Sequence, residues 1–149
     1  MEASAKAETM LDRTMISDEL PDPPIGRLIG LRIVSVLSGE SHFELDAGPH
    51  HANPMGTLHG GVLCDLADLA MGAAYASSLG REETFTTLEP KINFLRPVWR
   101  GKLFAVGKIV NRGRTVGLVE CDITDSQGRL VAKSTSTCMT LQKEKHRNR

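Results

Sequence analysis

Residues 53–61 read Asn-Pro-Met-Gly-Thr-Leu-His-Gly-Gly, and residues 62–76 continue as Val-Leu-Cys-Asp-Leu-Ala-Asp-Leu-Ala-Met-Gly-Ala-Ala-Tyr-Ala. The second run is apolar on nearly every helical face, which is typical of a helix buried inside a protein. Its only charged residues are Asp65 and Asp68. Glycines in the first turn leave backbone N–H groups bare, and such groups attract negative charge or a polarised carbonyl oxygen. The stretch therefore predicts one central helix with a donor site at its start.

The whole chain has 149 residues, a formal net charge of zero and three cysteines. This length fits one domain with a real core, and the neutral charge gives no electrostatic case for nucleic acid or an acidic membrane surface. Cys64, Cys121 and Cys138 are widely spaced and form no CxxC pair, so they indicate reduced thiols in a cytoplasmic compartment. The N-terminus lacks an apolar signal segment, and the aspartates within residues 62–79 argue against a membrane span. We expect a cytoplasmic protein with no membrane or nucleic-acid partner.

Prolines and a change of patterning divide the chain. Residues 1–24 start with many alanines and end in three prolines, which predicts a helical or frayed N-terminal arm. Residues 25–141 form the compact domain, and the charged residues 142–149 are expected to be a disordered tail. Outside the helix the domain has the period-two pattern and turn residues of antiparallel strands, at residues 31–37, 41–46, 84–95, 102–111, 115–125 and 130–141. We expect a bend or bulge at Pro90, because proline cannot donate to a ladder.

These elements predict an α+β fold in which five or six antiparallel strands wrap one long central helix. A chain of this size cannot easily bury the helix and both faces of a long sheet. The pattern therefore favours a homo-oligomer that associates through strand edges or helix contacts.

Asp68 is the first candidate for chemistry. It lies mid-helix with apolar residues one turn away on either side apart from Asp65, so we expect it to face protein rather than bulk water. A buried carboxylate is costly unless it is paired or used, which leaves two interpretations: a functional acid, or the structural partner of an arginine on a neighbouring strand. Asp65, nearer the helix start, is better explained as compensating the helix dipole.

His59 admits three roles: a general base, a metal ligand, or a group that orients the loop. Zinc is disfavoured, because neither a cysteine pair nor His-x-x-x-His spacing accompanies His50, His51 and His59. Cys64 with His59 as its base is a conceivable nucleophile, but a cysteine in an apolar helix is more often a small core residue. We expect no metal.

Two short runs have both a plain and a functional interpretation. Arg112-Gly113-Arg114 is either ordinary hairpin sequence with exposed bases or a phosphate clamp, since arginine binds phosphate in a bidentate manner. Gly60 and Gly61 could form only a tight entry to the helix. Their position directly before a buried helix favours an N–H donor site.

Several of these residues occur in an order that resembles the hotdog-fold acyl-CoA thioesterases of the phenylacetic-acid-degradation type. The set is Asn53, Gly56, His59-Gly60-Gly61 and Leu66-Ala67-Asp68, followed by Ile92-Asn93-Phe94-Leu95-Arg96-Pro97 and Gly113-Arg114-Thr115. The likeness covers about residues 25–141. It implies a curved antiparallel sheet around one helix, a homodimer that commonly pairs into a homotetramer, and an active site between two subunits.

The resemblance also implies roles for individual residues. Asp68 matches the catalytic carboxylate, and the Gly60 N–H matches the donor to the thioester carbonyl. Asn53 matches an amide that polarises or positions the reacting groups, His59 supports the loop, and Thr87 lies where the family often places a hydroxyl from the partner subunit. The residues expected at the CoA part of the substrate are Gly61, Phe94, Arg112, Gly113, Arg114 and Thr115. No cofactor is implied beyond the CoA of the substrate.

These roles predict hydrolysis of an acyl-CoA thioester to a free acid and CoA. Preorganised N–H donors stabilise an oxyanion by about 2.7–4 kcal/mol each, while Asp68 either activates water or attacks the carbonyl to form an anhydride. Two other functions stay open: a hydratase on the same fold, and a non-catalytic acyl-CoA or acyl-carrier binding module. The first usually needs an Asp–His pair, and the second gains nothing from a buried acid. The sequence leaves the acyl group open.

Overall fold

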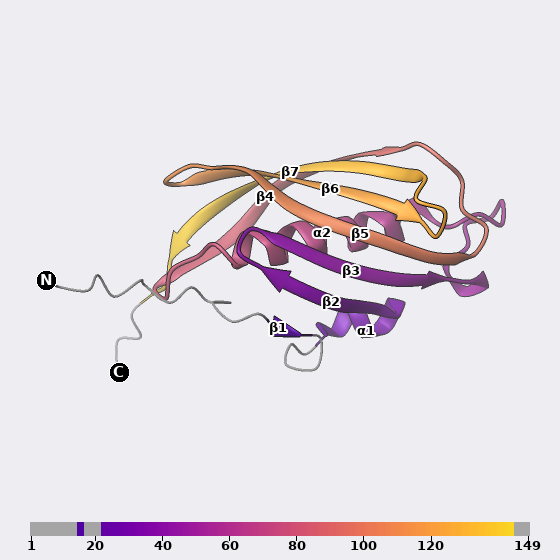
Figure 1. Cartoon of the computed structure of the whole chain (residues 1–149), viewed down its shortest axis with the longest axis horizontal. Coiled ribbons are helices and arrows are strands. Elements are labelled where there is room, and N and C mark those ends of the chain that lie inside the picture. Colours follow the sequence, from indigo (N-terminus) through magenta and orange to yellow (C-terminus); the bar gives the residue numbers. More distant parts are fainter. Residues whose placement is uncertain (1–14, 17–21, 145–149) are drawn as a thin grey trace, which may run out of the picture.

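A computed structural model describes residues 15–16 and 22–144 as an open, curved antiparallel sheet around a long helix (Figure 1). The seven strands lie in the order β1-β2-β3-β5-β6-β7-β4. They are β1 (Met15–Ile16), β2 (Leu31–Leu37), β3 (Glu40–Ala47), β4 (Glu83–Phe94), β5 (Gly101–Arg112), β6 (Val116–Asp125) and β7 (Leu130–Gln142). The helices are α1 (Pro24–Ile29), the short 3-10 helix η2 (Pro49–His51) and α2 (Gly60–Ala76). The predicted α+β hotdog arrangement is confirmed for one long helix and six long strands, to which the two-residue β1 adds a seventh.

One face of α2 packs on the concave side of the sheet. Its buried residues are Leu63, Leu66, Ala67, Ala70, Met71, Ala74 and Tyr75. They meet the inward-facing side chains of the central strands, such as Leu45, Ala105 and Ile123, each fully buried. Strand side chains alternate between the two faces of a sheet, which explains why the period-two pattern located these strands in the sequence.

Gly107 allows α2 to approach the sheet closely. A Cβ at this position of β5 would lie 2.4 Å from the carbonyl oxygen of Ala70, so only glycine fits. The same carbonyl accepts a hydrogen bond of 2.5 Å from the Ser41 hydroxyl on β3. Near the other end of α2 the Tyr75 hydroxyl lies 2.7 Å from Thr140 Oγ1 on β7. These contacts fix the depth and rotation of α2, and hence the direction of every side chain that it carries.

The opposite face of α2 is left open by the sheet. Asp68, which was expected to face protein, lies on this face and is exposed in the single chain, although it also lines a cavity with apolar walls. The sheet is not closed into a barrel, since β1 and β4 are its two edges. One chain therefore covers only one side of a helix that is apolar on nearly every side.

Two details of the secondary structure differ from expectation. The helix α1 was not predicted, because six residues between Pro23 and a left-handed Gly30 (φ 77°) are too few to show a helical period. The irregularity of β4 lies between Thr87 and Glu89, whereas Pro90 stays in register with β7. Since β4 is an edge strand, proline can direct its missing N–H away from the ladder.

The predicted N-terminal arm and charged tail lie mostly outside the described residues. Met15 and Ile16 form β1 opposite Val36 and Ser35 of β2, so this part of the arm is extended. No helix in the described ranges is both long enough and apolar enough to cross a membrane.

Candidate active site

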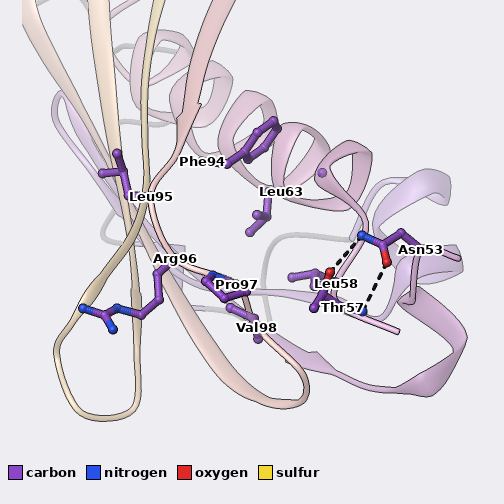
Figure 2. A pocket seen from close by; sticks show the side chains of 10 residues that line it. Asn53, Thr57, Leu58, Leu63, Phe94, Leu95, Arg96, Pro97 and Val98 are labelled. Atoms are coloured by element: carbon purple, nitrogen blue, oxygen red, sulfur yellow. Dashed lines mark hydrogen bonds between the residues drawn. The ribbon is translucent and has the colours of Figure 1, made fainter. Parts of the chain in front are cut away.

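The loop before α2 is held by the side chain of Asn53 (Figure 2). Asn53 Oδ1 accepts hydrogen bonds from the backbone N–H groups of Met55 and Thr57, at 2.9 and 3.2 Å. Its Nδ2 donates to Thr57 Oγ1 at 2.8 Å. An amide has two N–H donors, so one remains for an acceptor outside the loop. Asn53 thus organises the loop and keeps a donor for a ligand.

His59 caps the start of α2. The ring Nδ1 of His59 accepts a hydrogen bond of 2.9 Å from the backbone N–H of Gly61. The backbone N–H of His59 donates to the carbonyl oxygen of His51 at 2.9 Å. The Gly61 N–H is therefore used inside the loop. For the Gly60 N–H, no acceptor occurs among the residues that the structure describes. Within the described chain, the Gly60 N–H is therefore a backbone donor left over at the start of α2, beside the remaining N–H of Asn53.

Gly60 lines a cavity of about 390 Å³, which we call the Gly60 cavity (Figure 2). The other lining residues are Asn53, Thr57, Leu58, Leu63, Phe94, Leu95, Arg96, Pro97 and Val98. Phe94 packs directly over the glycine, since a Cβ at position 60 would lie 2.8 Å from Phe94 Cζ. The aromatic ring can approach the N–H donor this closely because position 60 carries no side chain.

Asp68 lies in a different cavity of about 320 Å³ on the open face of α2, the Asp68 cavity. Thr87 of β4 lines the same cavity and hydrogen-bonds to the Asp68 carboxylate. Burial against apolar walls, and then the charge of Asp65, raise the pKa of Asp68, while the hydrogen bond from Thr87 lowers it; the net direction is upward. Although Asp68 is exposed on one side, the cavity wall desolvates the other. A raised pKa suits a general base that works near neutral pH.

Cys64 is a poor candidate for the nucleophile. Burial, and then the charges of Asp65 and Asp68, raise the pKa of the Cys64 thiol. A thiol that stays protonated reacts weakly, and the His59 nitrogen Nδ1 is already engaged by Gly61. Within the described residues, no group of three His, Cys, Asp or Glu side chains could hold a metal ion.

Arg112 is directed back onto the protein. Its Nε donates to Ser78 Oγ at 3.1 Å, its Nη2 lies 3.6 Å from a carboxylate oxygen of Glu83, and its guanidinium lies 4.8 Å from the centre of the Tyr75 ring. These partners occupy Arg112 and make it a support of the β5–β6 hairpin. Arg114, at the tip, is the exposed arginine of the pair.

The predicted site residues occupy three places along α2. Those at its start are Asn53, His59, Gly60, Gly61 and Phe94, those at its middle are Asp68 and Thr87, and those near its end are Arg112, Gly113, Arg114 and Thr115. A helix rises about 1.5 Å per residue, so Asp68 lies about 12 Å along the axis from Gly60, and Tyr75 about 22 Å. A carbonyl oxygen held by the Gly60 N–H is therefore out of reach of the Asp68 carboxylate in the same chain.

Some residues of both cavities had no predicted role. Thr57 and Arg96 line the Gly60 cavity, although Arg96 stands within the run 92–97 that contributed to the resemblance. Gly72, Ala73 and Ala76 line the Asp68 cavity. Their spacing of one and two turns from Asp68 and Leu69 was a signal that could have placed them on the same face.

The chain is similar to known proteins over most of its length. Residues 55–132, more than half of it, match the family model of the thioesterase superfamily. A 1,4-dihydroxy-2-naphthoyl-CoA hydrolase from Listeria monocytogenes is 32% identical over 117 residues, which make up 78% of this chain and 95% of that protein. A solved thioesterase from Haemophilus influenzae has a TM-score of 0.83 at 24% identity and covers 91% of this chain and 97% of its own. The E. coli PaaI protein, from the phenylacetic acid degradation operon, has a TM-score of 0.76 at 24% identity, with 82% and 87% covered.

The two solved structures share the fold of this chain, and the family model matches the thioesterase superfamily, so the resemblance to the hotdog thioesterases is confirmed. The chain belongs to the thioesterase superfamily, and it is a hydrolase.

Proposed function

We propose that this protein hydrolyses acyl-CoA thioesters to a free acid and CoA. The observation that carries the proposal is Asp68, an aspartate with a raised pKa in an apolar cavity on the free face of the central helix. The Listeria relative is named for hydrolysis of a CoA thioester, which supports CoA as the leaving group. A binding module would gain nothing from a partly desolvated carboxylate that faces a thioester.

The proposed active site is assembled from two copies of the chain. The Gly60 N–H and the Asp68 carboxylate belong to positions about 12 Å apart along α2. One thioester carbonyl can meet both groups only if they come from different copies. In this arrangement Asp68 and Thr87 come from one copy, because they share a cavity, and Gly60 and Asn53 come from the other.

The edge strand β4 supplies a surface through which two copies can pair. It has 12 residues, and among the strands that the structure describes it pairs on one side, with β7. A long unpaired edge is a template for another strand. In an antiparallel pair of β4 strands, the half of one strand that carries Thr87 would lie opposite the half of the other strand that carries Asn93. Asn93 precedes Phe94, so this pairing would bring the Asp68 cavity of one copy to the Gly60 cavity of the other.

The proposed reaction begins with the thioester carbonyl oxygen accepting the Gly60 N–H, which stabilises the negative charge that develops there. Asp68 of the second copy takes a proton from water as the water oxygen adds to the carbonyl carbon. The tetrahedral intermediate then collapses, the C–S bond breaks, and the leaving CoA thiolate takes up the proton held by Asp68. In the covalent alternative, an Asp68 oxygen adds to the carbonyl carbon, the C–S bond breaks with release of the CoA thiolate, and water then hydrolyses the resulting anhydride to the free acid and the Asp68 carboxylate. The remaining N–H of Asn53 positions the carbonyl or the water.

We assign the CoA nucleotide to the β5–β6 hairpin of a neighbouring copy. Arg114 is exposed at its tip and can bind a phosphate in a bidentate manner. Gly113 makes the tip compact, since a Cβ there would lie 2.4 Å from the carbonyl oxygen of Val116. Arg112 holds the hairpin from behind. Because Arg112 packs on Tyr75, about 22 Å along α2 from Gly60, the hairpin serves a site whose Gly60 comes from another copy, and we propose that two dimers form a tetramer.

The proposed reaction needs no cofactor beyond the CoA of the substrate, because the thioester carbonyl is already electrophilic. We place it in the cytoplasm. The three cysteines Cys64, Cys121 and Cys138 are unpaired, as is usual in a reducing compartment.

Thiol release from a panel of acyl-CoA esters, followed with a thiol reagent, tests the proposal. We expect wild-type protein to release thiol and the Asp68→Asn variant to lose about 10²–10⁴-fold in kcat. Circular dichroism and size-exclusion chromatography show whether the variant keeps its fold and assembly. An unchanged kcat in a folded Asp68→Asn protein contradicts the proposal. Binding of acyl-CoA by wild-type protein without thiol release would identify a binding module instead.

A further inference from the structure

The Asp68 cavity continues along the open face of α2 beyond the carboxylate. Its floor is the helix stripe of Leu69, Gly72, Ala73 and Ala76, and Phe85 and Phe43 stand among its walls. From Asp68 to Ala76 the helix advances about 12 Å. The cavity is therefore long enough to hold an extended group that starts at the reacting carbonyl.

Small side chains keep this floor low. Gly72 has no side chain, and a Cβ there would already touch Phe85 Cζ at 3.4 Å. Ala73 and Ala76 carry a single methyl group each. The helix propensity of leucine is within a few tenths of a kcal/mol of that of alanine. Helix formation alone therefore does not require alanine at positions 73 and 76. What the small residues provide is space.

The polar groups of this cavity gather at one end. Among the residues that the structure describes, Asp68 and Thr87 contribute the polar side chains of the lining, and the other lining residues are apolar or glycine. A hydroxyl or a charge placed near Ala76 would lose its water without gaining a partner. The Gly60 cavity is different, because Asn53, Thr57 and Arg96 line it and can meet polar atoms of the CoA arm.

We propose that the Asp68 cavity binds the acyl group and selects an unsubstituted, medium-length aliphatic chain. This inference rests on the proposed function and names its substrate class. A carbon of an extended chain advances roughly 1.3 Å, given C–C bonds of about 1.5 Å, so the distance from Asp68 to Ala76 accommodates about eight to ten carbons. Ala76 sets the length limit, and the apolar far end rejects acyl groups that carry a hydroxyl there.

Wild-type protein alone gives the first test. We expect kcat/KM for thiol release to rise from butyryl-CoA to octanoyl- or decanoyl-CoA and to fall again for tetradecanoyl-CoA. Phenylacetyl-CoA should exceed para-hydroxyphenylacetyl-CoA by about tenfold to a hundredfold, the usual discrimination of an apolar site against an added hydroxyl. Equal rates for the two aryl esters, or a preference for the hydroxylated one, would overturn the proposal.

Two substitutions along the floor of the cavity should shorten the longest acyl chain that it accepts. Ala76→Leu should lower kcat/KM for decanoyl-CoA by a much larger factor than kcat/KM for butyryl-CoA, so that the advantage of the longer chain is lost. Ala73→Leu should stop the chain earlier, because position 73 lies only about 7–8 Å from Asp68. Circular dichroism and the melting temperature show whether each variant is folded. As a comparison, Leu95→Trp in the Gly60 cavity should raise KM for all chain lengths alike, since this exposed residue would face the CoA arm.

The outcomes separate this inference from the function on which it rests. If no acyl-CoA is hydrolysed, the proposed function fails, and the chain-length profile is then read from acyl-CoA dissociation constants. If thiol is released but Ala76→Leu leaves the chain-length profile unchanged, the proposal that the Asp68 cavity binds the acyl chain is wrong, while the proposed function stands. A chain-length limit that moves with Leu95→Trp would place the acyl group in the Gly60 cavity. If Ala76→Leu alters the oligomeric state and leaves the chain-length profile unchanged, the Asp68 cavity is a contact between subunits and does not bind the acyl chain.

Discussion

At the scale of single residues, the protonation of Asp68 is set by neighbours of opposite effect. Apolar walls and the nearby Asp65 raise its pKa, and the Thr87 hydroxyl lowers it. In sequence terms Asp65 looked like simple dipole compensation, because its proximity to Asp68 carried no information about where either side chain pointed. In the structure the same residue helps to tune the proposed base.

This arrangement predicts the pH dependence of hydrolysis. Activity requires the Asp68 carboxylate, so kcat/KM should fall on the acid side, at a pH above the ordinary range of an aspartate because the pKa is raised. Asp65→Asn removes a cause that raises the pKa, and the acid limb should move to lower pH. Thr87→Val removes a cause that lowers it, and the limb should move to higher pH. A pH profile of kcat/KM measures both.

Asp46→Asn serves as the control, since Asp46 is an exposed residue of β3 that lies near Arg32. On the acid side, the pH profile of kcat/KM for Asp46→Asn should coincide with that of the wild type. Limbs that move in the same direction for Asp65→Asn and Thr87→Val would show that Asp68 does not govern the profile.

The N–H of Gly60 can be removed with little change of backbone. Proline is favoured in the first turn of a helix, and His59 already has the extended conformation (φ −64°, ψ 131°) that a residue before proline adopts. We expect Gly60→Pro to lower kcat by about 10²–10³-fold, the usual loss of one oxyanion donor. Gly60→Ala adds a Cβ against the exposed, movable ring of Phe94 but keeps the N–H, so its loss should be smaller. Equal losses in steady-state kinetics would point to the Cβ rather than the donor.

At the scale of elements, the sequence predicted what depends on local periodicity. Apolar alternation located the long strands, and the run after Gly61 located α2. The inward direction of Arg112 depends on Ser78 and Tyr75, which are distant in the sequence, and no pattern indicated it. The position of the β4 irregularity was missed for a similar reason, since whether Pro90 disrupts a strand depends on which side of it is paired.

The contact between α2 and β5 gives a prediction of stability. Gly107→Ala would put a Cβ 2.4 Å from the Ala70 carbonyl oxygen, and neither backbone can easily move. We expect the free energy of unfolding to fall by about 1–3 kcal/mol, the usual cost of overpacking. Chemical denaturation measures it. Gly72→Ala makes the same chemical change on the open face of α2 and should not lower stability, because alanine is favoured over glycine in a helix by about 1 kcal/mol. Equal effects of the two substitutions would contradict the packing described for Gly107.

At the scale of the whole molecule, the sequence predicted a homo-oligomer, because one chain of this size cannot easily bury the apolar helix and both faces of the sheet. It could not show which face of α2 the sheet leaves open, because the helix is apolar on nearly all sides and only the curvature of the sheet decides. The structure shows that this face carries Asp68, and that Gly60 lies out of its reach. The proposed pairing through β4 would cover this face with a second copy and bring the Gly60 of that copy to Asp68.

Mixing two inactive variants tests this proposal most directly. Gly60→Pro and Asp68→Asn chains, carrying different affinity tags, are co-expressed, and oligomers that contain both are purified. If each site takes Gly60 from one copy and Asp68 from another, a mixed dimer has one intact site, and thiol release should recover to about half of the wild-type rate per dimer. If both groups act within one chain, every site is defective, and mixed oligomers as inactive as the parent variants would contradict the account.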